Sequence, residues 1–103
     1  MLWDKTKYEL KLKGGCGQIR TTGMHGLIQH LIIEPTSLDT IWSLIIKDGD
    51  EDIIYKLIDH EGRLDEIRGL PIGKDKPEKL NVLIYDSTIN ENFNLIFKVR
   101  EVR

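Results

Sequence analysis

The chain has 103 residues, of which 40% are hydrophobic and 31% are charged, and its formal net charge is −2. This length predicts a single domain with a modest core, and the composition excludes a disordered chain. The balance of 15 basic and 17 acidic residues gives no broad positive field for nucleic acid.

The only cysteine, Cys16, rules out an intrachain disulfide and with it the class of disulfide-stapled secreted domains. The N-terminal sequence MLWDKTKYELK lacks the basic segment and apolar stretch of a signal peptide. No apolar run approaches the roughly 20 residues that a membrane-spanning helix needs. We therefore expect synthesis in a cytoplasm and no membrane partner.

Residues 1–25 predict an N-terminal arm or a pair of edge strands, ahead of a core at residues 26–103. The segment YELKLK at 8–13 alternates, with Tyr8, Leu10 and Leu12 on one face of a half-buried strand. Two glycines at 14–15 signal a turn, and QIRTT at 18–22 is a short second strand. Basic residues interleave with these apolar ones, and we interpret them as a solvated strand face: Lys5, Lys7, Lys11, Lys13 and Arg20.

Three segments in the middle of the chain predict strands. LIQHLII at 27–33 has some helical spacing, but its isoleucines and the proline at position 35 favour a strand. IWSLIIK at 41–47 is apolar on both faces, which predicts a central strand. IIYKLID at 53–59 predicts the strand that follows it.

The last third of the chain is less uniform. Glycines and prolines break residues 60–79 into predicted turns, with a short helix at 64–68 as the weaker alternative. KLNVLIYD at 79–86 and NFNLIFKVREV at 92–102 predict the final two strands, and the second has the cleanest alternation in the chain.

These elements predict an all-β fold. No long amphipathic helix separates the strands, which excludes parallel βαβ units. We expect an antiparallel β-sandwich of six to eight strands, either immunoglobulin-like or jelly-roll-like. Its aromatic core anchors are predicted to be Trp42, Phe93 and Phe97.

The segment KDGDED at 47–52 allows two interpretations. Its alternating aspartates resemble the start of a helical calcium loop, but that loop needs glycine at its sixth position, where this chain has Ile53. Asp48, Gly49 and Asp50 instead predict a hairpin turn, in which glycine supplies positive φ and aspartate caps the turn. Weak calcium binding at the loop tip stays open.

No other motif predicts chemistry. His25 and His30 are five residues apart, so on one strand they face opposite sides, which does not suit shared zinc ligation. GGCG at 14–17 lacks the lysine and hydroxyl of a phosphate-binding loop. We therefore expect no catalytic residue, no metal and no cofactor, and a protein that is not an enzyme and works through its surfaces.

From residue 30 to 102, the order of turns and core positions resembles small virion proteins of tailed bacteriophages, particularly marine ones. A proline-and-hydroxyl segment, an Asp-Gly hairpin, an Ile-Tyr strand, an LP-x-G segment and a strand ending near D-S-T follow one another. The matching positions are Pro35, Thr36, Ser37, Thr40, Trp42, Asp48, Gly49, Asp50, Tyr55, Gly62, Leu70, Pro71, Gly73, Asp86, Phe93 and Glu101.

The resemblance implies a structural component of a phage particle, located in the virion as a capsid decoration protein or a neck or tail adaptor. Its partners would be other virion proteins and copies of itself. The candidate interface lies in the N-terminal segment and the 60–79 region: Leu2, Trp3, Tyr8, Leu70, Pro71 and Ile72. The alternative is a free carbohydrate- or peptide-binding module that uses Trp3, Tyr85 and His60.

Overall fold

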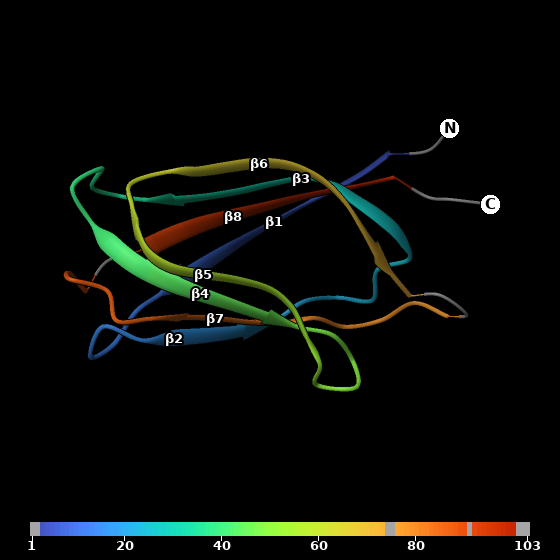
Figure 1. The fold of residues 1–103 in the computed structure, drawn as a ribbon, viewed down its shortest axis with the longest axis horizontal. Helices are drawn as coiled ribbons and strands as arrows, with labels where there is room; N and C mark the ends of the chain where they lie inside the picture. The colour runs from blue at the N-terminus through green and yellow to red at the C-terminus, as the bar shows by residue number, and fades with distance from the viewer. Residues whose placement is uncertain (1–2, 74–75, 91, 101–103) are drawn as a thin grey trace.

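A computed structural model of the protein describes residues 3–73, 76–90 and 92–100. They form eight strands in two antiparallel sheets that pack face to face (Figure 1). The strands are β1 (Trp3–Lys11), β2 (Gly17–Arg20), β3 (Gly26–Pro35), β4 (Ile41–Lys47), β5 (Ile53–Glu61), β6 (Leu64–Ile72), β7 (Asn81–Tyr85) and β8 (Asn92–Arg100). The all-β sandwich that the sequence predicts is therefore confirmed.

The strand order identifies the sandwich as a jelly roll. One sheet has the order β1-β8-β3-β6 and the other the order β2-β7-β4-β5. The chain therefore passes from one sheet to the other at every connection except β4–β5. Consequently the connections gather at two ends. The β1–β2, β3–β4, β5–β6 and β7–β8 connections lie at one end, and the other three connections lie with the chain termini at the opposite end (Figure 1). No helix in the described residues is long and apolar enough to cross a membrane.

The core forms between the sheets because each strand turns alternate residues inward. On β4 the inward residues are Trp42, Leu44 and Ile46, and all three are fully buried. On β8 they include Phe93 and Phe97, which are also fully buried. The three aromatic anchors predicted from the sequence are thus confirmed.

Trp42 joins the two sheets. Its ring meets that of Phe93, from the opposite sheet, edge to face with centroids 5.3 Å apart. Its indole Nε1–H donates a 2.8 Å hydrogen bond to the carbonyl oxygen of Gly62, in the β5–β6 turn where the chain changes sheets. The buried N–H is therefore satisfied by the turn that it also holds in place.

The prediction of turns and a weak helix in residues 60–79 is wrong for residues 64–72, which form β6. Leu64 is paired with Ile33 and Pro71 with Leu27 across the ladder to β3. Gly69 and Pro71 suggested a break, but β6 is the edge of its sheet, where a missing N–H costs no ladder bond on the open side. A local breaker signal was therefore compatible with a strand.

The N-terminal segment forms strands as far as the structure describes it. β1 pairs with β8 from Trp3 to Lys11, and β2 pairs with β7. Leu10 and Leu12 lie in the core. Of the two interpretations left open for residues 1–25, the structure has edge strands at residues 3–20; Leu2 lies outside the described residues.

Replacing Phe93 with alanine should lower the free energy of unfolding by about 3–5 kcal/mol, because it leaves a cavity against Trp42 in a closely packed core. Urea unfolding followed by circular dichroism measures the change. Asn94→Ala, at the exposed neighbouring position, is the matched control and should shift stability by no more than about 0.5 kcal/mol. Equal effects of the two substitutions would contradict the assigned register of β8.

Candidate functional site

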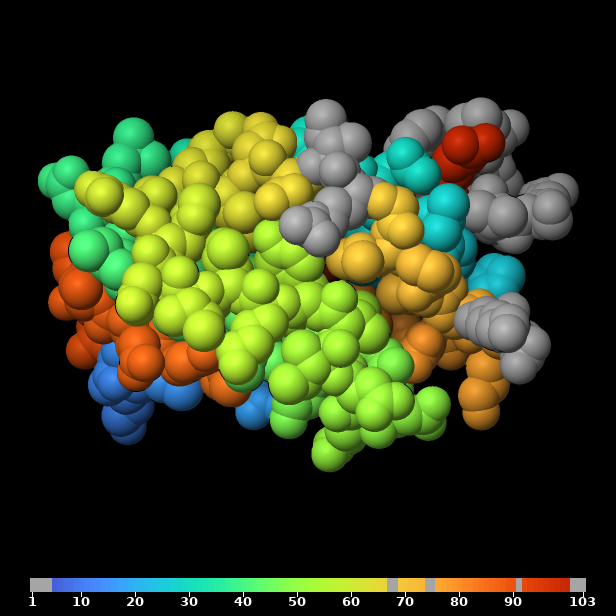
Figure 2. Space-filling model, viewed as in Figure 1, coloured from blue at the N-terminus to red at the C-terminus, as the bar shows by residue number. Residues whose placement is uncertain are grey.

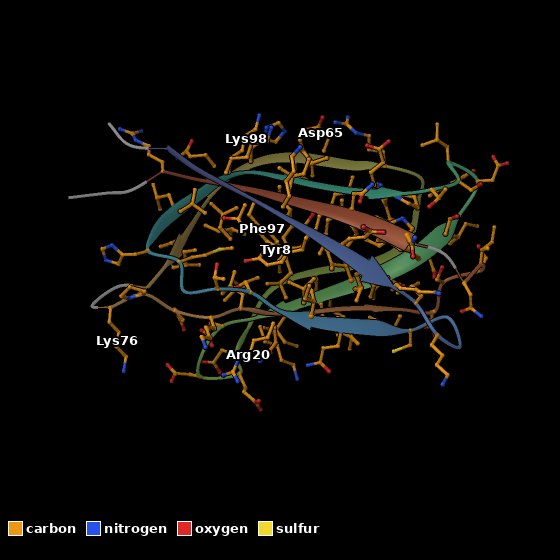
Figure 3. The ribbon with its side chains drawn as sticks, turned by 180° about the vertical axis from the view of Figure 1, so that it is seen from behind. Tyr8, Arg20, Asp65, Lys76, Phe97 and Lys98 are labelled. Atoms are coloured by element: carbon orange, nitrogen blue, oxygen red, sulfur yellow. The ribbon has the colours of Figure 1, made fainter. Side chains whose placement is uncertain are left out.

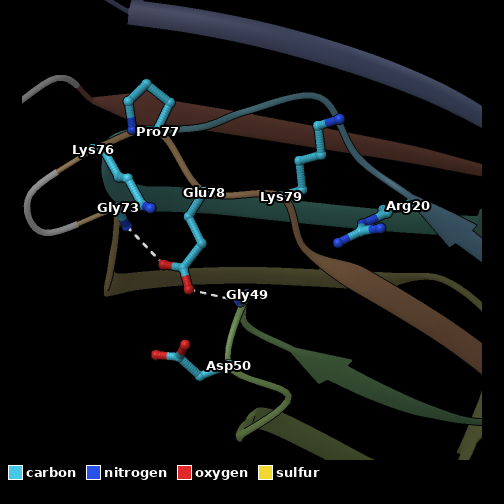
Figure 4. A pocket seen from close by; sticks show the side chains of 8 residues that line it. All are labelled: Arg20, Gly49, Asp50, Gly73, Lys76, Pro77, Glu78 and Lys79. Carbon is cyan, nitrogen blue, oxygen red and sulfur yellow. Dashed lines mark hydrogen bonds between the residues drawn. The ribbon is translucent and has the colours of Figure 1, made fainter.

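The three connections at the end of the sandwich near the termini bring a group of polar side chains together. The β2–β3, β4–β5 and β6–β7 connections meet there, and Figure 4 shows the side chains at their junction. They hold three carboxylates, from Asp48, Asp50 and Glu78, whose ligand atoms lie within 4.8 Å of one another. This cluster is the candidate site.

The acidic hairpin between β4 and β5 is confirmed, and Asp48 caps it. Asp48 Oδ1 accepts hydrogen bonds of 2.9 Å from the backbone N–H groups of both Asp50 and Asp52. The predicted reason for glycine at position 49 is wrong, because the residue with positive φ in this turn is Glu51, at 66°. A β-carbon at Gly49 would lie 2.9 Å from Glu78 Oε1, so the glycine is needed for close approach.

Glu78 fastens the three connections together. Its Oε1 accepts a 2.6 Å bond from the Gly49 N–H, and its Oε2 accepts a 3.0 Å bond from the Gly73 N–H (Figure 4). Its own backbone N–H and carbonyl exchange two 2.8 Å bonds with Met24 in the β2–β3 connection. One residue therefore links all three segments, through charge-assisted bonds on two sides.

Gly73 is where the chain approaches this junction most closely. Its φ is 60°, in the left-handed region that favours glycine. A β-carbon there would collide with the carbonyl oxygen of Met24 and lie 2.7 Å from that of Lys76. The LP-x-G segment singled out from the sequence thus ends at a position that no other residue fits without displacing backbone.

Asp48, Asp50 and Glu78 offer oxygen ligands of the kind that calcium prefers. However, both oxygens of Glu78 and one oxygen of Asp48 already accept backbone hydrogen bonds. These bonds account for the positions of Asp48 and Glu78 without an ion. The cluster is therefore best explained as the fastening of three connections, with spare lone pairs turned toward solvent.

Basic groups surround the carboxylates. Arg20 from β2, and Lys76 and Lys79 from the β6–β7 connection, line an open hollow together with Asp50 and Glu78. Figures 3 and 4 show Arg20 and Lys76 on separate elements that converge on this end. A hollow with both charge signs on its rim suits a polar ligand with hydroxyl or peptide groups more than a strongly charged one.

Of the residues proposed from the sequence as an interface, those whose side chains the structure describes lie on β1 and β6, the two edge strands of one sheet. Tyr8 packs edge to face on Phe97 between the sheets, and its hydroxyl contacts Thr22 (Figure 3). Leu70 is half-buried, Pro71 is exposed, and Ile72 is a core residue with only 4% of its surface exposed. Leu2 and the side chain of Trp3 lie outside the described residues.

Comparison of the chain with protein-family models, with curated proteins and with solved structures gives no match. Glu78 was missed by sequence reasoning, because its partners Gly49 and Gly73 are 29 and 5 residues away and no motif connects them. The only hints in the sequence were Gly49 and Gly73 themselves, whose N–H groups donate to the two oxygens of Glu78.

Replacing Glu78 with alanine should lower the free energy of unfolding by about 1–3 kcal/mol, because two backbone donors lose a charged acceptor. Glu78→Gln keeps one acceptor oxygen and should cost less. Thermal and urea unfolding measure both variants, with exposed Lys79→Ala as the control. A Glu78→Ala protein as stable as the control would show that water replaces the carboxylate at no cost.

Asp65 on β6 is a carboxylate outside this cluster. The hydrogen bond from His30 lowers its pKa below the usual 3.8, and Arg63 makes a smaller contribution in the same direction. A lowered folded-state pKa stabilises the protein above the unfolded pKa, and that contribution disappears as pH falls through the folded value. Nuclear magnetic resonance titration should show the pKa of Asp65 rising in His30→Ala, and rising less in Arg63→Ala. The opposite order would contradict this assignment.

Proposed function

We propose that the protein is a non-enzymatic structural component of a tailed-phage particle, acting by subunit docking as a capsid decoration protein or a neck or tail adaptor. The observation that carries the proposal is a rigid sandwich with large apolar side chains on its outside. Leu38, Ile41, Ile53, Ile58 and Ile89 are all exposed. Apolar side chains that lie together outside a core are typical of surfaces that meet another protein, and Ile41 and Ile58 lie on the adjacent strands β4 and β5.

The end of the sandwich opposite the termini supports docking because its connections are fastened to one another. The Ser87 N–H donates to the Gly15 carbonyl, and the Gly15 N–H donates to Asn90 Oδ1. Ile41 exchanges bonds with Thr88 in the same way. A surface that is already ordered loses little conformational entropy on binding, which favours repeated assembly.

The jelly-roll fold adds support by analogy only, since this fold is common in viral capsid domains and also in lectins. The same analogy keeps the second candidate, a carbohydrate- or peptide-binding module. The mixed-charge hollow around Arg20, Asp50, Lys76 and Glu78 favours it. Tyr85 and His60, named for that module from the sequence, lie on other parts of the sandwich, on β7 and β5.

The virion proposal predicts that the protein co-sediments with phage particles purified on a density gradient from a lysate of the host that carries its gene. Quantitative mass spectrometry should find it in a fixed ratio to the major capsid protein. A phage-encoded replication protein from the same lysate is the control and should stay in the soluble fraction. Recovery of this protein in the soluble fraction alone would overturn the virion proposal, and binding on a glycan array would then favour the second candidate.

A further inference from the structure

The outer face of the β2-β7-β4-β5 sheet carries a group of neighbouring apolar side chains. On β4 and β7 the residues that alternate with the core positions point away from the core, and they include Ile41, Ile45, Leu83 and Tyr85. Ile45 is paired directly with Leu83 across the ladder. β5, whose yellow-green atoms lie on the face turned to the viewer in Figure 2, is the edge strand of this sheet, and its Ile58 is 61% exposed. These residues form what we call the β4–β7 face.

The outer face of the other sheet differs. It also holds apolar residues, Ile96 paired with Ile32, but Ile32 is only 8% exposed. Charged side chains flank this pair on both sides, Lys7 on β1 and Asp65 on β6, whereas the pair of Ile45 and Leu83 has a charged neighbour, Lys56, on one side only. On the β4–β7 face Ile41 and Ile58 are exposed, and Ile45, Leu83 and Tyr85 are half-buried. The difference indicates a surface that is covered in the assembled state.

On the β4–β7 face, positive side chains lie toward one end of the strands and a negative side chain lies toward the other. Toward the β4–β5 hairpin the face carries Arg20, Lys47 and Lys56, on β2, β4 and β5. Toward the opposite end it carries the carboxylate of Glu61 on β5. Asp59 lies between the two ends, at the level of Ser43, whose Oγ accepts a 3.0 Å hydrogen bond from the Asp59 N–H. Glu61 is paired with Ile41, and Lys56 is paired with Ile45, so one charge of each sign lies next to an isoleucine.

We propose that the β4–β7 face binds the same face of a second copy of this chain, about a two-fold axis that runs across the strands at the level of Ser43. Such an axis reverses the strand direction between the copies. It places Ile45 of one copy over Ile41 of the other, and Lys56 over Glu61 of the other. The centre is then formed by Tyr85 and Ile58 from both copies, with the exposed Asp59 beside them on the edge strand β5.

Charge complementarity selects this occupant. In an isologous interface every contact occurs twice, so a surface must be complementary to its own reversed image. A face with Lys56 beside Ile45 toward one end and Glu61 beside Ile41 toward the other meets that requirement when it is turned end for end. The two sheets would pack as the layers of a sandwich do, about 10 Å apart.

This inference names the surface through which copies of the chain would dock to one another, and in that respect it rests on the proposed function. Sedimentation equilibrium of the purified protein over about 10–500 μM should show a reversible dimer of twice the 11.9 kDa chain mass. Ile58→Asp should weaken the dimer at least about tenfold, because it removes an apolar contact on the axis and adds a second carboxylate next to Asp59. Leu38→Asp is the matched control, since Leu38 is 64% exposed but lies in the β3–β4 connection, and it should leave the dimer unchanged.

A charge exchange tests the orientation. Lys56→Glu and Glu61→Lys should each weaken the dimer, because each sets like charges against one another, and the double variant should restore it. Circular dichroism confirms that all variants fold. A monomer at every concentration, or equal weakening by Ile58→Asp and Leu38→Asp, overturns the interface. If the double variant dimerises no better than Lys56→Glu or Glu61→Lys alone, the two-fold arrangement is overturned. Neither outcome changes the result expected for particle association in the gradient experiment, so the two proposals are tested separately.

Discussion

The packing of Trp42 is the interaction on which the rest of the structure depends. Its ring lies against Phe93 of the opposite sheet and against His60 of its own neighbour β5, and its N–H holds the β5–β6 turn. In this jelly roll the chain crosses between the sheets at every connection except β4–β5, so the two layers must be held in register across the core. A large aromatic side chain with one polar atom does this, because its area fills the gap and its N–H fixes a turn.

The two ends of the sandwich are closed by different means. At the end away from the termini, backbone groups and the Asn90 side chain fasten neighbouring connections to one another. At the other end, a single carboxylate from Glu78 reaches two of them. In both arrangements, backbone N–H groups of the turns, which have no partner in a strand ladder, find an acceptor in a neighbouring connection. Both also leave the outer faces of the sheets available for other contacts.

Particular elements show how far the sequence could predict the fold. The β4–β5 hairpin was predictable because apolar alternation on both sides and an Asp-Gly turn are local signals. β6 was missed because Gly69 and Pro71 are local breakers, and only its place at a sheet edge makes them harmless. Glu78 could not be found, since the glycines that it binds come near it only when three connections meet. The β4–β7 face was predictable only in part: residues 41–47 were recognised as apolar on both sides, but this was interpreted as a central strand and not as an exposed apolar face.

The amino-acid sequence by itself determined the all-β class, the hairpin at residues 48–52 and the aromatic residues of the core, because each depends on spacing along one short segment. Only the tertiary structure decided the jelly-roll order, the role of Glu78 and which apolar residues stay outside. These depend on pairings between segments tens of residues apart, such as β1 with β8 and β3 with β6. The period of a strand says that it has two faces, but the layer that covers one of them is chosen by the whole chain.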